Sequence, residues 1–186
     1  MADVLLLHHA LGLTPGVQAF AAELRSAGHA VTTPDLFDGE TFSEIQDGVN
    51  HAEAIGFPNL IAKGVDLARE LPDGGFVAGI SLGALPAQAI AHTKPGVAGL
   101  VLLHGGDVPV GTVGEVWPTS VAVQIHLAEG DEWCPIDDAR EFAEATDADL
   151  HVYPGDAHLF TDSSFHEHDE IATALVLDRM LAFLGR

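Results

Sequence analysis

The segment Gly75-Phe-Val-Ala-Gly-Ile80-Ser81-Leu82-Gly83 decides the fold of this chain. It begins with an apolar run of the length of a buried strand, and residues 82–92 follow at once with the pattern of a helix. The serine therefore stands on the turn between strand and helix, with a glycine two residues to either side. A Gly-x-Ser-x-Gly string in this setting is typical of a nucleophile elbow, where glycines leave the room that a Cβ would occupy. In a chain with 20 glycines, the alternative is an ordinary glycine-rich turn.

Short apolar runs alternate with longer amphipathic segments along the rest of the chain. Strands are predicted at residues 4–7, 30–33, 75–80, 97–103, 120–128 and 150–153. Helices are predicted at residues 14–27, 42–55, 59–71, 82–92, 137–146 and 167–184. This alternation indicates βαβ units, and therefore an α/β fold with a mostly parallel central sheet and helices on both faces. No repeat or linker divides the sequence, so we expect a single domain over residues 1–186.

The composition excludes several classes of protein. Among 186 residues, 28 are acidic and only 7 are basic, which gives a net charge of −21. Seven scattered basic residues cannot form a stripe that neutralises phosphates, so neither nucleic acid nor a membrane surface is an expected partner. No apolar run approaches the roughly 20 residues needed to span a bilayer. The N-terminus also lacks the basic region of a signal peptide, and we expect a cytoplasmic protein.

Two further residues complete the requirements of a serine nucleophile. A serine needs a base, and the base needs a carboxylate that orients it. Asp131 directly follows the strand predicted at residues 120–128, and His158 follows the last predicted strand. Because carboxyl ends of parallel strands share one edge of a sheet, Ser81, Asp131 and His158 are expected to meet there. Their chain order, Ser-Asp-His, is that of α/β-hydrolases, so we expect this fold without a large cap.

Several longer stretches make a more specific likeness visible. The sequence resembles the dienelactone hydrolase family in its compact form over essentially its whole length. The stretches that carry the resemblance are His8-His9-Ala10-Leu11-Gly12, Pro34-Asp-Leu-Phe37, Asp38-Gly-Glu-Thr-Phe42, the elbow, Gly130-Asp131…Pro135 and Tyr153-Pro-Gly-Asp-Ala-His158-Leu-Phe160. The resemblance implies that Ser81 is the nucleophile, Asp131 the acid and His158 the base. It also implies an oxyanion hole formed by the backbone amides of Leu82 and Ala10.

The sequence departs from the family pattern at three positions near this site. Many members carry a cysteine nucleophile, where this chain has Ser81. In those members a glutamate follows the first strand, and His9 stands at the matching position. Members that cleave dienelactone also place an arginine after the catalytic histidine to bind the substrate carboxylate. Asp162 matches that position, so His9 and Asp162 are expected at the substrate pocket, with a preference for uncharged substrates.

Other residues offer weaker alternatives for the same chemistry. Cys134, the only cysteine, excludes an internal disulfide and is more simply a packing residue than a nucleophile. Asp107 also follows a strand and is an alternative acid, although a turn aspartate is the simpler interpretation. Eleven histidines raise the question of a metal site, and they are densest at His8-His9 and at residues 166–169. Neighbouring strand residues point to opposite faces, so His8 and His9 are not expected to share an ion.

The sequence therefore predicts a serine hydrolase of small, uncharged esters or lactones that needs neither cofactor nor metal. Three alternatives stay open. The chain could be a catalytically idle scaffold that binds a small ligand or partner, since fold does not fix function. It could be a metal-dependent hydrolase that uses the histidines. It could also hydrolyse a carboxylate substrate of the dienelactone type.

Overall fold

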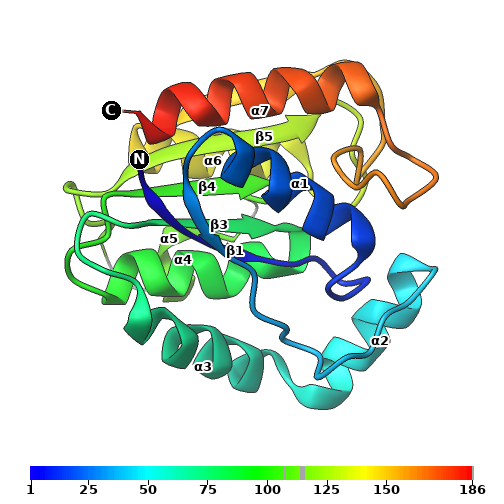
Figure 1. Ribbon diagram of the computed structural model, residues 1–186, viewed down its shortest axis with the longest axis horizontal. Helices are drawn as coiled ribbons and strands as arrows, with labels where there is room; N and C mark the ends of the chain where they lie inside the picture. Colours follow the sequence, from blue (N-terminus) through cyan, green and yellow to red (C-terminus); the bar gives the residue numbers. More distant parts are fainter. Residues whose placement is uncertain (107, 114–115, 186) are drawn as a thin grey trace.

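The computed structural model describes residues 1–106, 108–113 and 116–185 (Figure 1). Within these ranges six strands form one sheet in the order β2-β1-β3-β4-β5-β6, and every neighbouring pair is parallel. The strands are β1 (Asp3–Leu7), β2 (Ala30–Thr32), β3 (Phe76–Ile80), β4 (Gly99–Leu103), β5 (Ala122–Ala128) and β6 (Asp149–Tyr153). The expected α/β fold is confirmed, and the sheet is parallel throughout.

Helices cover both faces of this sheet (Figure 1). One face packs against α1 (Pro15–Ser26) and α7 (Glu170–Leu184). The other packs against α4 (Ala84–Thr93) and α6 (Ile136–Thr146), with α3 (Phe57–Leu67) against α4. The remaining elements are α2 (Ile45–Ile55), α5 (Val110–Val113) and the short 3₁₀ turns η1 (Ala68–Glu70) and η2 (Ser81–Gly83).

The apolar run of β1 shows why this strand lies inside the molecule. Successive strand side chains point to opposite faces of a sheet. Leu5 and Leu7 accordingly join the core beneath α4 and α6, whereas Val4 and Leu6 join the core beneath α1 and α7. A strand that is buried on both faces needs apolar residues throughout its buried part, which is the pattern of residues 4–7.

Three of the predicted helices have different boundaries in the structure. The helix predicted at residues 42–55 begins only at Ile45, and the one predicted at 59–71 runs from Phe57 to Leu67. The terminal helix begins at Glu170 rather than at residue 167. Its N-cap is Asp169, whose carboxylate accepts hydrogen bonds from the backbone N–H groups of residues 171 and 172. An N-cap aspartate satisfies the free donors of a first helical turn, and this fixes where the helix starts.

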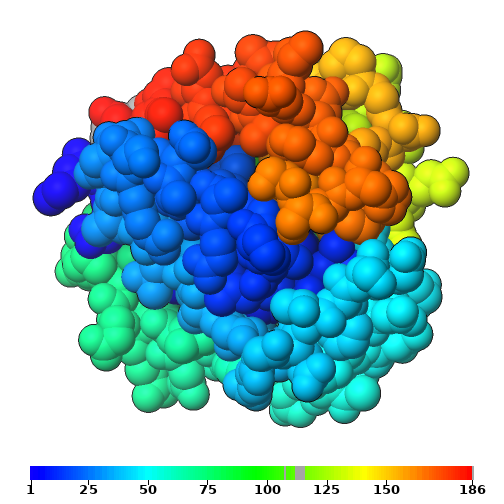
Figure 2. Space-filling view, turned by 45° about the vertical axis from the view of Figure 1, so that its right-hand side comes forward, coloured from blue at the N-terminus to red at the C-terminus, as the bar shows by residue number. Residues whose placement is uncertain are grey.

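All six strands point toward the same edge of the sheet, on the right of Figure 1. Figure 2 turns this edge forward and shows the segment after β1, in blue, between the orange loop after β6 and α2 in cyan. Segments distant in sequence therefore meet where parallel strands end.

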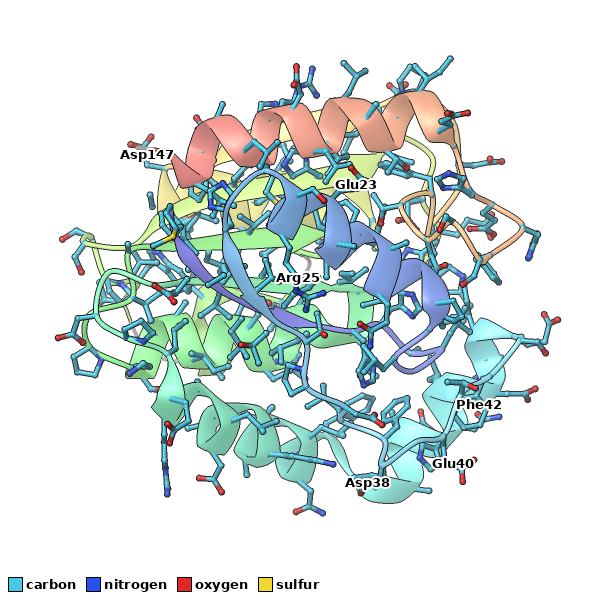
Figure 3. All side chains as sticks on the ribbon, in the orientation of Figure 1. Glu23, Arg25, Asp38, Glu40, Phe42 and Asp147 are labelled. Atoms are coloured by element: carbon cyan, nitrogen blue, oxygen red, sulfur yellow. The ribbon has the colours of Figure 1, made fainter. Side chains whose placement is uncertain are left out.

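Two exposed turn aspartates with left-handed backbone, Asp38 and Asp147, lie at opposite ends of the molecule (Figure 3). Over the described ranges, no helix has the length and apolar character that crossing a membrane requires.

Two buried histidines, His8 and His126, are held in the neutral form. Burial lowers the pKa of His8 from 6.5 to about 4 and the pKa of His126 well below 6.5. Each ring is nevertheless bonded through both nitrogens. His8 pairs with the carbonyl of His9 and the N–H of Leu36, and His126 pairs with Gln124 and Tyr153.

The lowered pKa values of these two histidines predict that the folded protein loses stability in mild acid. Below pH 6.5 these histidines bind protons in the unfolded chain but stay neutral in the folded protein, so the free energy of unfolding decreases as pH falls toward about 4. Each such group costs about 1.4 kcal/mol per pH unit in this window. We expect the melting temperature to decrease over the window, and to decrease less steeply in His126→Gln. An unchanged slope in that variant would contradict the role assigned to His126.

Candidate active site

Ser81 lies on the turn between β3 and α4, at the carboxyl edge of the sheet. Its φ is +48°, in the left-handed region that residues other than glycine rarely adopt. A Cβ at Gly79 would overlap the carbonyl of Gly83, and one at Gly83 would overlap the carbonyls of Leu7 and His8. The two flanking glycines therefore let the serine turn pack directly against β1. This is the geometry of a nucleophile elbow.

A chain of short hydrogen bonds joins Ser81 to two residues from other loops. The Oγ atom of Ser81 lies 2.7 Å from Nε2 of His158. The Nδ1 atom of the same ring lies 2.7 and 2.9 Å from the two carboxylate oxygens of Asp131. Because the carboxylate accepts the Nδ1 proton, Nε2 presents its lone pair to the serine hydroxyl. The structure thus brings together the three residues that the sequence placed at three strand ends.

Asp131 is itself fixed by the loop that carries it. One of its oxygens accepts hydrogen bonds from the backbone N–H groups of Trp133, at 2.9 Å, and Cys134, at 3.2 Å. The side chain is buried, as is that of His158. A carboxylate that is bonded to its own loop has little freedom to rotate, so it holds the imidazole in one orientation.

A pocket of about 200 Å³ opens beside Ser81 and His158. Most of its wall is apolar, and the polar side chains on it are uncharged or histidine. The lining residues are Ala10, Ile45, Val49, Phe57, Ser81, Leu82, Ala84, Leu85, His104, Val108, Trp133 and His158. Burial lowers the pKa of His104 well below 6.5, so this ring is also neutral near pH 7. The pocket suits a compact group without charge.

The two residues expected to form an oxyanion hole both line this pocket. Leu82 lies in η2, at the start of the helical segment that continues as α4. The first N–H groups of a helix have no partner within it, which leaves them able to bind an anion. Ala10 approaches from the segment after β1, and α2 packs closely above it. A Cβ at Gly48 of α2 would overlap the carbonyl of Ala10.

The dienelactone hydrolase family model matches residues 2–186. The chain belongs to this family. No match is found among curated proteins.

Solved structures of dienelactone hydrolases and related proteins share the fold. A protein of Klebsiella pneumoniae subsp. pneumoniae assigned as a dienelactone hydrolase has a TM-score of 0.76 at 16% identity, covering 100% of this chain and 87% of its own. A dienelactone hydrolase-like promiscuous phosphotriesterase from metagenomic libraries has a TM-score of 0.75 at 17% identity, covering 100% and 86%. The dienelactone hydrolase of Anabaena variabilis reaches 0.72 at 18% identity, covering 100% and 86%.

The structure places the side chains of His9 and Asp162 away from the pocket wall, contrary to the expectation from the dienelactone hydrolase pattern. Both are almost fully buried, and they bond to each other at 2.7 Å between Nε2 and Oδ2. The positions of these residues relative to the strands follow from the sequence, but the directions of their side chains do not. A substrate in the pocket therefore does not face Asp162.

Glu167 contributes to this site, and the sequence pattern did not indicate it. Because the terminal helix begins at Glu170, Glu167 lies in the loop, where its Oε2 accepts hydrogen bonds from two backbone N–H groups. These belong to His158, at 2.8 Å, and Leu159, at 3.2 Å. The glutamate therefore anchors the backbone of the histidine. Its distance of nine residues from His158 gave no local signal for this contact.

The sequence also offered other candidate residues for this chemistry. Cys134 is buried in the loop of Asp131 and does not lie on a nucleophile elbow, which agrees with a packing role. Asp107 lies outside the described residues. Among residues 1–106, 108–113 and 116–185, no three histidine, cysteine or carboxylate side chains gather to hold a metal ion. His104 and His126 are buried, and each bonds a neighbouring side chain.

Glu167 can be tested with a pair of variants. Glu167→Ala leaves two N–H groups without their carboxylate acceptor, which costs about 1–3 kcal/mol of stability. It also frees the backbone of His158, so hydrolytic turnover should fall about tenfold or more. Glu167→Gln keeps an oxygen acceptor and should stay near the wild type in both. Thermal melts and kcat measure the two effects, and equal behaviour of the variants would refute the anchoring role.

Proposed function

We propose that this protein is a serine hydrolase of small, uncharged carboxylic esters or lactones. The observation that carries the proposal is the hydrogen-bonded series Ser81, His158 and Asp131 beside an apolar pocket. Membership of the dienelactone hydrolase family supports hydrolase chemistry. The proposed specificity for esters or lactones is inferred from the apolar lining of the pocket.

Each residue has a defined role in the proposed reaction. Ser81 Oγ attacks the substrate carbonyl while Nε2 of His158 accepts the hydroxyl proton. Asp131 holds the ring and stabilises the imidazolium that forms. The backbone amides of Leu82 and Ala10 bind the oxygen on which negative charge develops. His158 then protonates the leaving alcohol, and a water molecule activated by the same ring hydrolyses the acyl-enzyme.

The preference for uncharged substrates follows from the positions of the cations. None of the described lysine and arginine residues lines the pocket. Arg25, labelled in Figure 3, donates two hydrogen bonds to the carbonyl of Val31 in β2 and does not line the pocket. Lys63 pairs with Asp38, and Arg140 with Asp137. A substrate carboxylate in this apolar pocket would lose water without gaining a cation, which is unfavourable.

The nucleophile can be identified by labelling. A fluorophosphonate should modify the wild-type protein once, at Ser81, and should not modify Ser81→Ala. Ser81→Ala should also lose ester turnover by at least about a thousandfold while keeping its fold. Labelling separates the alternatives, because an idle scaffold or a metal-dependent hydrolase would not give a stoichiometric adduct at Ser81. Retention of more than about a tenth of the activity in Ser81→Ala would exclude it as the nucleophile.

Substrate charge can be tested with a matched pair. We expect 4-nitrophenyl butyrate to exceed 4-nitrophenyl hemisuccinate by about ten- to a hundredfold in kcat/KM, because the second acyl chain ends in a carboxylate. Leu85→Lys places an ammonium group at the pocket wall and should reduce this ratio. Leu85→Met, of similar length and uncharged, is the control and should keep it. A wild-type preference for hemisuccinate would instead favour a carboxylate substrate of the dienelactone type.

A further inference from the structure

Asp162 is a buried carboxylate that the proposed reaction does not use. It is 2% exposed, and it accepts four hydrogen bonds. His9 Nε2, at 2.7 Å, and Thr14 Oγ1, at 2.5 Å, donate to one oxygen. The backbone N–H and the hydroxyl of Ser164 donate to the other, at 2.7 and 2.6 Å. A buried carboxylate with this many donors has a single defined orientation.

The bonds of His9 define its protonation. Its Nδ1 accepts the backbone N–H of Leu11 at 3.2 Å, so the ring proton lies on Nε2 and is donated to Asp162. Burial by itself raises the pKa of Asp162, but the hydrogen bonds from His9, Ser164 and Thr14 bring it well below its ordinary value. The pair is therefore a neutral imidazole that donates to a carboxylate anion.

This pair joins the two loops from which the site is built. His9 and Leu11 flank Ala10, which lines the pocket. Asp162 lies in the loop of His158, where its own N–H donates to the carbonyl of Leu159 at 2.9 Å. Figure 2 shows these two segments, blue and orange, in contact at the surface.

The start of α1 is shaped around the same carboxylate. Thr14 caps α1, because its hydroxyl oxygen accepts the N–H of Val17 while its proton goes to Asp162. A Cβ at Gly16 would overlap the carboxyl group of Asp162. The negative charge at a helix N-terminus is favourable, so it further fixes the position of the segment between β1 and α1.

We propose that Asp162 is a positioning residue that, through His9, holds the peptide of Ala10 where an oxyanion can receive its N–H. This inference rests on the proposed function, in which Ala10 supplies one of the two donors. Donors of this kind act by being fixed before charge develops, and a displacement of about 1 Å can cost a hundredfold in rate. Losing the support of Asp162 should therefore lower kcat and leave substrate binding nearly unchanged.

The test compares Asp162→Ala, His9→Ala and their double variant with the wild type, using an uncharged ester. We expect each single variant to lose about 10- to 100-fold in kcat, with KM changed less than about threefold. Because the two residues act as one unit, the kcat of the double variant should be no lower than that of the less active single variant. Asp156→Asn removes an exposed carboxylate from the same loop and is the control for charge alone.

A transition-state readout separates positioning from general loosening. A boronic acid that forms a tetrahedral adduct at Ser81 should bind more weakly to Asp162→Ala by the same factor as the loss of kcat/KM. Asp162→Asn keeps an acceptor for His9 and should recover part of kcat. It also serves as the deciding variant if Asp162→Ala does not fold.

The outcomes distinguish this inference from the proposed function. If the wild type hydrolyses esters and labels at Ser81 but the Asp162 variants keep their kcat, only the positioning role is wrong. A rise in KM with unchanged kcat, or additive losses in the double variant, would also overturn it. If the wild type neither hydrolyses esters nor labels at Ser81, the proposed function itself fails.

Discussion

The left-handed turn at Ser81 is the constraint on which the site depends. It is stable because β3 is buried between β1 and β4, and because Gly79 and Gly83 let α4 and β1 approach without a Cβ between them. The strain of a positive φ is offset only where surrounding packing fixes the backbone. Here that packing is the centre of the parallel sheet. The loops after β5 and β6 then need only to bring Asp131 and His158 to a serine that is already fixed.

The positions of the strands in the sequence and their mostly parallel arrangement could be predicted, because burial on both faces favours an unbroken apolar run in the central strands. The runs around Leu5 and Val77 carry this pattern, and each is a central strand. The start of the last helix was predicted less accurately because it depends on a single capping residue. Asp169 caps the last helix, and the acidic residues before it gave no reason to choose one over another.

The residue types of the site could be predicted from their positions after strands, but the directions of side chains could not. Ser81, Asp131 and His158 were found because parallel strands end at one edge. Asp162 was assigned to the pocket because its position matched the arginine of the family. Hydrogen bonds from Thr14 and Ser164 set the direction of its side chain. Thr14 is distant in the sequence, and the nearby serine is too weak a signal to predict the contact. Glu167 was missed for the same reason, since its partners are backbone groups that any sequence possesses.

The charge of −21 has a consequence for the end of the proposed reaction. Hydrolysis of a neutral ester converts an uncharged acyl group into a carboxylate within an apolar pocket. The negative charge of the protein therefore does not repel the uncharged substrate as it enters, whereas it does repel the anionic acid product. The same field hinders the product from returning. An enzyme of this kind releases its acid product readily and is inhibited little as the acid accumulates. Added salt weakens this effect, because it screens the repulsion between the protein and the product.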